Sequence, residues 1–316
     1  MSILVPYLSD AMVRVTELAA IAAERLAGRG DEKAADAAAV DAMRQAFNNI
    51  DFKGRVVIGE GERDEAPMLY IGEEVGTGLG PEVDIALDPL EGTTLTAKAM
   101  ENALAVLAIS PRGGLLHAPD TYMDKIAVGP GLPANTIDLD ATAAENVVEI
   151  AKAKGVGVSE ITACVLDRPR HMEIIESLRS AGARISLISD GDVAGVINTT
   201  NPQTGIDLYI GQGGAPEGVL AAAALKCVGG QMQGRLRFRN DDERKRAERV
   251  GITDYNKKYD LSELASSETV FCATGVTKGC LVDGVMRSNG RVETDTLIMS
   301  SADRMIRRIR SSHSIE

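Results

Sequence analysis

The strongest constraint on the fold is a regular alternation of helical and strand-like segments in the second half of the chain. Apolar, β-branched runs that predict strands follow amphipathic runs that predict helices, and the connections between them are short. Such alternation is typical of parallel βαβ units, so this half is expected to be α/β. The expected helices cover 144–155, 170–182, 192–198 and 216–229, and the expected strands cover 161–167, 184–189 and 206–211.

The first 130 or so residues show a different pattern, which predicts helices packed on a largely antiparallel sheet. One helix is expected from about Ser9, a suitable N-cap, to a stop at Gly28, and a second helix follows with Asp31 as its cap. Strand-like runs then occur at 55–58, 83–87, 103–110 and 125–129. Strand-like runs return near the C-terminus, at 268–275, 279–285 and 292–300.

A domain boundary is expected in the segment 129–143, which is rich in glycine, proline and small polar residues. The sequence therefore predicts an α+β half at 1–138 and an α/β half at 139–316. We expect the first half to carry metal binding and catalysis, and the second half to bind the substrate.

Composition excludes several classes of protein. The net charge of −12 and the lack of a long basic run argue against nucleic-acid binding. No apolar run is long enough to cross a bilayer, and the N-terminal residues do not resemble a secretory signal. The four cysteines are dispersed without a C-x-x-C pair, so neither a zinc site nor a disulfide framework is expected. These features predict a cytoplasmic protein without a membrane partner.

The motif DPLEGTT (88–94), directly after the strand-like run 83–87, carries the most specific chemistry. Asp88 and Glu91 can bind a hard cation such as Mg²⁺ or Mn²⁺. If the residues from Gly92 on open a helix, their backbone N–H groups can face a phosphate. Carboxylates, metal and phosphate in this order are what metal-assisted hydrolysis of a phosphate ester needs, because the metal offsets phosphoryl charge and activates water.

Other polar motifs stand where a substrate could bind. Acids also occur at Asp36, in the loop from Glu60 to Glu65, and at Glu217 beside glycines. The arginines of RPR (168–170) follow one expected strand and suit forked phosphate contacts, and the acids of DGD (190–192) follow another and can accept hydrogen bonds from sugar hydroxyls. His171, next to RPR, is more simply interpreted as a structural residue than as a helper of the arginines.

The motif DPLEGT resembles the D-P-(I/L)-D-G-T signature of the metal-dependent, lithium-sensitive phosphatases, which have a layered αβαβα sugar-phosphatase fold. Further segments are similar to class II fructose-1,6-bisphosphatases, the bacterial form, in the same order along essentially the whole chain. These segments are 56–78, 83–94, 102–110, 117–125, 190–194, 213–219 and 273–279.

This resemblance implies hydrolysis of the 1-phosphate of fructose 1,6-bisphosphate in gluconeogenesis, with Mg²⁺ or Mn²⁺, by a homodimer or homotetramer. Some relatives also act on sedoheptulose 1,7-bisphosphate. Residue by residue, the resemblance implies metal ligands at Asp36, Glu60, Asp88, Glu91 and Glu217, and catalytic roles for Thr93, Glu60 and Asp64. It implies substrate contacts from Glu91, Gly92, Thr93, Tyr122, Arg168, Pro169, Arg170, Asp190, Gly191, Asp192 and Gly214.

One position departs from the family pattern, and other classes of protein compete with this interpretation. Glu32 stands where enterobacterial members have a lysine, and Lys33 is the nearest base. A monophosphatase for inositol or nucleotide phosphates is the main alternative, and an acidic metal-binding protein without catalysis is another. A dinucleotide site in IGQGGAPEG is disfavoured, because Pro216 falls where the third glycine would be required.

Overall fold

The computed structural model describes residue 4, residues 6–61 and residues 67–314. The described residues form two compact units, one within 1–116 and 266–316, the other within 117–265. The chain thus leaves the first unit and returns to it for the C-terminal strands. This division differs from the two consecutive halves expected from the sequence, because the run near residue 125 joins the second unit and the run near residue 270 joins the first.

An eight-stranded sheet forms the first unit, in the order β12-β13-β11-β4-β3-β1-β2, with β14 also paired to β13. Among the described strands of this sheet, β1 and β3 are the only parallel neighbours, which confirms the expectation of a largely antiparallel sheet. The strands are β1 (Lys53–Ile58), β2 (Glu74–Val75), β3 (Glu82–Glu91), β4 (Leu104–Pro111), β11 (Val270–Gly275), β12 (Met286–Ser288), β13 (Arg291–Ser300) and β14 (Met305–Ser314).

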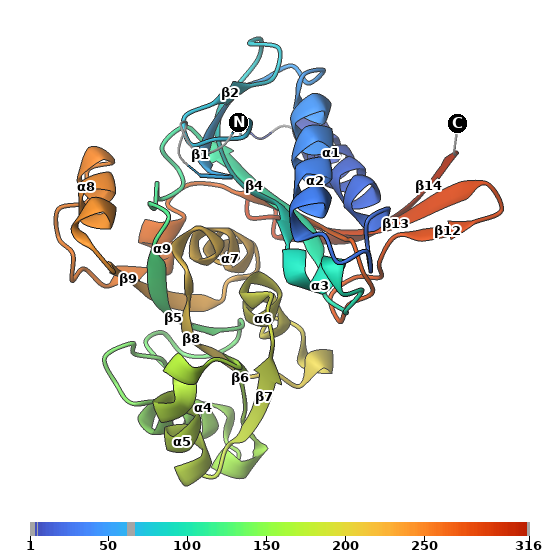
Figure 1. Cartoon of the computed structure of the whole chain (residues 1–316). Helices are drawn as coiled ribbons and strands as arrows, with labels where there is room; N and C mark the ends of the chain where they lie inside the picture. Colours follow the sequence, from blue (N-terminus) through green and yellow to red (C-terminus); the bar gives the residue numbers. More distant parts are fainter. Residues whose placement is uncertain (1–3, 5, 62–66, 315–316) are drawn as a thin grey trace. The chain divides into compact units, whose positions relative to one another are not determined.

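Three helices belong to this unit: α1 (Pro6–Glu24), α2 (Glu32–Phe47) and the short α3 (Thr93–Ala97). Helices α1 and α2 lie side by side on the sheet (Figure 1) and bury an aliphatic core that includes Met12, Met43 and Ile85. Asp31 caps α2 as expected, since its carboxylate accepts the backbone N–H of Ala34 at 2.9 Å.

The second unit is built on a six-stranded sheet in the order β10-β9-β5-β8-β6-β7. Strand β6 pairs in parallel with both β7 and β8, which confirms the expected βαβ units, while β5, β9 and β10 extend the sheet in antiparallel fashion. The strands are β5 (Tyr122–Val128), β6 (Thr162–Leu166), β7 (Arg184–Ile188), β8 (Leu208–Gly214), β9 (Gln231–Arg237) and β10 (Tyr259–Asp260).

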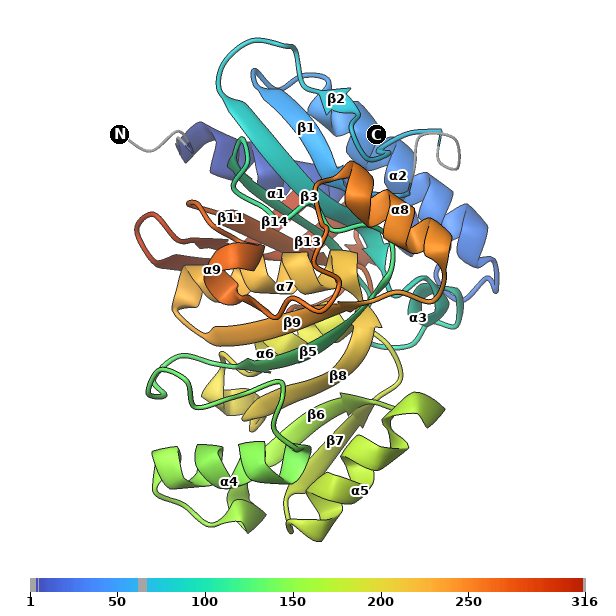
Figure 2. The ribbon, with the colours of Figure 1, turned by 90° about the vertical axis from the view of Figure 1, so that its left-hand side faces the viewer.

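Helices cover both faces of this second sheet (Figure 2). Side chains that alternate along β6 and β8, such as Ala163 and Ile210, share a core with α4 and α5, whereas Tyr209 faces Gly195 of α6 on the opposite side. The helices are α4 (Ala143–Lys154), α5 (Met172–Ser180), α6 (Asp192–Asn198), α7 (Ala215–Val228), α8 (Asp241–Arg249) and α9 (Leu261–Leu264), with 3₁₀ turns η1 (Val158–Glu160), η2 (Pro169–His171) and η3 (Pro202–Thr204).

Several boundaries differ from the sequence-based expectations. Helix α1 begins at Pro6, so Ser9 is a buried residue inside the helix and not its cap; proline suits a first helical turn, where the missing N–H would have no partner. The run 279–285 forms no strand, whereas β14 was not expected from its polar sequence. Strand β14 pairs along its whole length with β13, a long-range contact that composition does not reveal.

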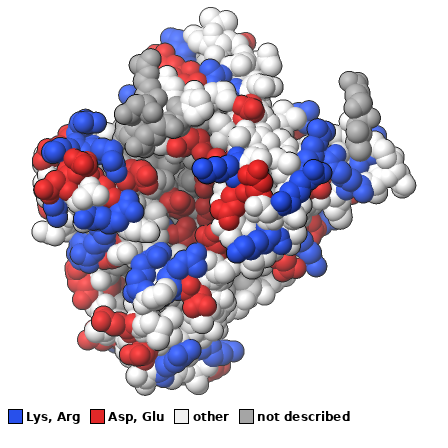
Figure 3. Space-filling view, viewed as in Figure 1, with Lys and Arg blue, Asp and Glu red and all other residues white. Residues whose placement is uncertain are grey.

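The surface and the cysteines agree with the composition. None of the described helices is long and apolar enough to span a membrane. None of the four cysteines, all of which lie within the described residues, forms a disulfide. On the face drawn in Figure 3, basic and acidic side chains of the described residues are interspersed, so no extended basic surface is seen there.

Candidate functional site

A bulge in strand β3 brings two carboxylates to the same side of the first sheet. Asp88 pairs with Val106 of β4 and Glu91 pairs with Leu104, so three steps along β3 match two steps along β4. In a regular strand, residues three apart point to opposite faces; with the extra residue, Asp88 and Glu91 share a face. Pro89 explains the irregularity, because it has no N–H for the ladder.

The two carboxylates are close enough to serve one cation. A carboxylate oxygen of Asp88 lies within 4.8 Å of one from Glu91. Glu91 is buried, and Asp88 is half-buried with one oxygen accepting the N–H of Leu90 at 3.0 Å. Paired oxygen donors of this type suit Mg²⁺ or Mn²⁺. The strand was expected to end before Asp88, but β3 continues through Glu91.

Helix α3 starts directly after this pair, as the sequence predicts. Gly92 precedes its first residue in a left-handed conformation, with φ of 88°, which other residues adopt at a cost. Thr93 is the first helical residue and is half-buried. The hydroxyl of Thr93, for which the resemblance implies a catalytic role, therefore follows the carboxylates by one tight turn.

Two further proposed ligands belong to the same unit. Asp36 lies in α2, which packs against β3 and α3, and burial raises the pKa of its carboxyl above the ordinary value of 3.8. A divalent cation would offset that cost. Glu60 follows β1, and its backbone N–H donates to the carbonyl of Leu69 at 3.0 Å. Asp64, expected to be catalytic, lies outside the described residues.

In the second unit, two glycines leave room for two acids. A side chain at Gly213 would overlap the carboxylate of Asp192, and one at Gly214 would overlap that of Glu217. Gly214 is the N-cap of α7, and Glu217 lies in the first turn of this helix. Gly213 and Gly214 of IGQGGAPEG are thus explained by these close approaches and need no dinucleotide.

Lys125 connects the two loops that hold these acids. Its ammonium is buried, with 1% of the side chain exposed, and donates both to a carboxylate oxygen of Asp192 and to the carbonyl of Gly214, the latter at 2.8 Å. Asp192 was expected to accept hydrogen bonds from a sugar. Its Oδ2 is held in this buried ion pair, and Asp190, in the loop before α6, is half-buried.

Tyr122, at the start of β5, lies beside two guanidinium groups. The Cζ atoms of Arg170 and Arg239 lie 5.1 and 4.9 Å from the centre of its ring, respectively. Arg239 is anchored by an ion pair with the buried Glu243. Two cations beside one aromatic ring form a local positive site in an acidic protein, which suits a phosphate.

Arg239 was not recognised as a site residue from the sequence. The only signal was the alternation of arginines in RLRFR (235–239), which places them on one side of an extended segment. The guanidinium of Arg237 is paired with Asp124, whereas that of Arg239 is paired with Glu243 and also lies beside the ring of Tyr122. The segment that follows forms helix α8, whose charged residues are mostly exposed.

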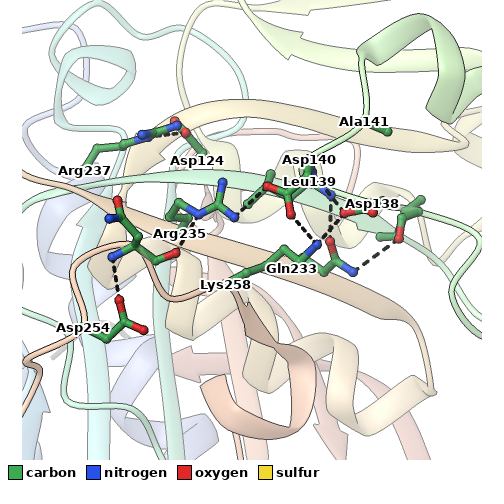
Figure 4. A network of polar contacts seen from close by, with 12 residues as sticks. Asp124, Asp138, Leu139, Asp140, Ala141, Gln233, Arg235, Arg237, Asp254 and Lys258 are labelled. Carbon is green, nitrogen blue, oxygen red and sulfur yellow. Dashed lines mark hydrogen bonds and ion pairs between the residues drawn. The ribbon is translucent and has the colours of Figure 1, made fainter.

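A network of ion pairs ties β9 to the segment before α4 (Figure 4). Lys258 donates to Asp138 at 2.6 Å and to Asp140 at 2.7 Å, and Arg235 pairs with Asp140 at 2.6 Å. The hydrogen bond from Lys258 is the main reason why the pKa of each of these two carboxyls is below its ordinary value. This network fixes the segment that leads into α4. Helix α4 borders the same face of the sheet as Arg170.

These features define a class of protein. A short helix follows a bulged, carboxylate-bearing strand in one unit, and the other unit presents arginines and acids on loops after parallel strands. This combination is that of a metal-assisted phosphate-ester hydrolase.

Sequence comparison identifies the family. The model of the family described as bacterial fructose-1,6-bisphosphatase, glpX-encoded, matches residues 7–313, and the chain belongs to this family. The chain is 46% identical over 317 aligned residues to fructose-1,6-bisphosphatase 1 class 2 of Escherichia coli (strain K12), with 96% of this chain and 94% of the relative covered. The class 2 fructose-1,6-bisphosphatases of Escherichia coli O6:H1 and Shigella flexneri give the same identity and coverage.

Proposed function

We propose that this member of the fructose-1,6-bisphosphatase family hydrolyses the 1-phosphate of fructose 1,6-bisphosphate to give fructose 6-phosphate and phosphate, as a step of gluconeogenesis. The observation that carries the proposal is the bulge in β3. It turns Asp88 and Glu91 to one face immediately before the helix that begins at Thr93.

The proposed metal ligands are all carboxylates: Asp36, Glu60, Asp88, Glu91 and Glu217. Hard oxygen donors of this kind fit Mg²⁺ or Mn²⁺ and disfavour softer metals. When bound, the cation offsets the charge of the phosphoryl oxygens and makes the attacking water more acidic. Thr93 would orient that water in line with the phosphorus, with Glu60 and Asp64 completing the catalytic set.

The uncleaved phosphate is proposed to bind at Arg168 and Arg170, next to Tyr122. Guanidinium groups suit this phosphate because the metal and its acids already hold the reacting one. The remaining proposed substrate contacts are Glu91, Gly92, Thr93, Pro169, Asp190, Gly191, Asp192 and Gly214. Lys33, which is exposed, is a weaker candidate for phosphate than these arginines.

A substrate panel tests this function. Initial rates would be measured with fructose 1,6-bisphosphate, sedoheptulose 1,7-bisphosphate, inositol monophosphate and adenosine monophosphate, each with Mg²⁺, Mn²⁺ or EDTA. We expect the highest kcat/KM on a sugar bisphosphate and no turnover in EDTA. Preference for a monophosphate would instead support the monophosphatase alternative, and the panel also ranks the two sugars and the two metals.

A matched pair of variants tests the metal site. Glu91→Gln should lower kcat by about three orders of magnitude, because one cation ligand is lost from a hydrolytic centre. Glu101→Gln, an exposed position in the same unit, should leave kcat unchanged. Near-normal turnover by Glu91→Gln would refute the assignment of the metal site. A homodimer or homotetramer in the cytoplasm remains a prediction, and sedimentation velocity would measure the oligomer.

A further inference from the structure

The turn that carries the two arginines is attached to strand β8 at Gln212. Strand β6 pairs with β8 at Leu208 and Tyr209. Further along β8, on the side away from β5, the backbone of Gln212 instead meets residues of the turn η2. Its N–H donates to His171 at 2.8 Å, and its carbonyl accepts hydrogen bonds from Arg170 at 2.9 and 3.2 Å.

His171 is well suited to fix this turn. Its side chain is buried, with the residue 1% exposed, and Nδ1 lies 2.8 Å from the carbonyl of Leu166. Because the N–H of Gln212 is a donor, Nε2 must be unprotonated, so the imidazole is neutral with its proton on Nδ1, shared with Leu166. Gly211 leaves just enough room, since a side chain there would lie 3.3 Å from the ring.

Arg170 completes a two-point attachment. Two of its five N–H donors go to the carbonyl of Gln212, which leaves three for another ligand. Consecutive residues of one turn therefore bind both backbone groups of Gln212. Such an arrangement restricts the turn to one orientation and, with it, the directions in which Arg168 and Arg170 extend.

We propose that His171 is a positioning residue for the uncleaved phosphate: its neutral imidazole fixes the turn 169–171 on β8 and so holds Arg168 and Arg170 in place for that phosphate. This proposal rests on the proposed bisphosphatase function. It assigns His171 a specific effect on substrate affinity, beyond that of a packed core residue.

His171→Asn tests the proposal, because the asparagine amide can still donate to the carbonyl of Leu166 but offers no acceptor to the N–H of Gln212. We expect KM for fructose 1,6-bisphosphate to rise about tenfold, kcat to change less than about threefold, and kinetics on p-nitrophenyl phosphate to stay the same. His313→Asn is the matched control, since this half-buried histidine belongs to the first unit, and it should leave KM unchanged.

A double-mutant cycle separates positioning from general damage. If His171 acts through the arginines, His171→Asn should add nothing to the KM effect of a variant with both Arg168→Ala and Arg170→Ala. Additive effects, or equal losses on both substrates, would overturn the proposal. If the wild type hydrolyses the bisphosphate but His171→Asn has an unchanged KM, the positioning proposal would be overturned and the proposed function would stand. A wild type inactive on the bisphosphate would overturn both.

A second test measures the protonation of His171 in the wild type and needs no variant of His171. The chain has three histidines, so the ¹⁵N resonances of His171 can be assigned by elimination with His117→Gln and His313→Gln. At pH 7.5, we expect His171 to show the neutral form protonated on Nδ1. Detection of the Nε2-protonated form or of imidazolium at that pH would refute the arrangement.

Discussion

The buried contact of Lys125 leads to a quantitative prediction for Lys125→Met. The ammonium and its partner Asp192 have side chains only 1% and 7% exposed, so little water can replace either of them. Methionine is similar in length but uncharged. The variant would therefore leave the carboxylate of Asp192 buried without its cation and the carbonyl of Gly214 without a donor.

Loss of one partner of a buried pair costs about 3–5 kcal/mol, so the free energy of unfolding of Lys125→Met should fall by that amount. The same analysis predicts a small effect for Lys152→Met on α4. Its ion pair with Glu149 spans 3.5 Å between side chains 77% and 57% exposed, and such pairs contribute about 0–1 kcal/mol.

Urea unfolding followed by far-ultraviolet circular dichroism would measure both losses. The double variant Lys125→Met with Asp192→Asn should recover part of the loss, because it removes the uncompensated charge. A loss for Lys125→Met no larger than that for Lys152→Met would refute the reasoning. It would mean that water or a local rearrangement satisfies Asp192 as well as the ammonium does.

Three other predictions concern catalysis and pH. Thr93→Val should lower kcat far more than it raises KM, because orientation of water strengthens only toward the transition state; an increase in KM alone would show a substrate contact instead. Arg239→Ala should raise KM for fructose 1,6-bisphosphate about tenfold without changing kinetics on p-nitrophenyl phosphate, as expected for one lost guanidinium contact. The pKa of His171 in the folded protein is lower than its ordinary 6.5, mainly because the side chain is buried. The neutral imidazole should therefore contribute fully to stability above pH 6.5, and this contribution should be lost as the pH falls through the pKa of the folded protein. The stability difference between wild type and His171→Asn, from urea unfolding at several pH values, should therefore shrink as the pH falls, and a constant difference would contradict this.

The motif around Asp88 shows both what sequence predicts and what it leaves open. Its acids, its proline and the helix start after Gly92 could be recognised directly, because each depends on local chemistry. The bulge could not, since it is defined by the pairing of β3 with β4, which begins more than ten residues later. Sequence therefore predicts candidate residues for the chemistry, whereas the shared face of the two carboxylates depends on pairing within the sheet.

Long-range contacts limited the prediction for the second unit in the same way. His171 looked like an ordinary residue beside RPR, because the strand whose backbone N–H donates a hydrogen bond to it lies 41 positions further along the chain. The spacing of the glycines before α7 already disfavoured a dinucleotide site, but only the nearby carboxylates of Asp192 and Glu217 show why Gly213 and Gly214 are needed. In both cases the decisive partner is distant in sequence, so no local pattern could reveal it.

The last residues of strand β8 extend beyond its pairing with β6, so their backbone groups on that side no longer have a strand beside them. In this chain, buried polar side chains supply the missing partners: Lys125 binds the carbonyl of Gly214, and His171 binds the N–H of Gln212. Neither side chain needs to touch the substrate for this role. Because a buried polar group without a partner is costly, each anchor stabilises one loop geometry over the alternatives. We therefore infer that the proposed substrate loops are ordered before the sugar phosphate binds.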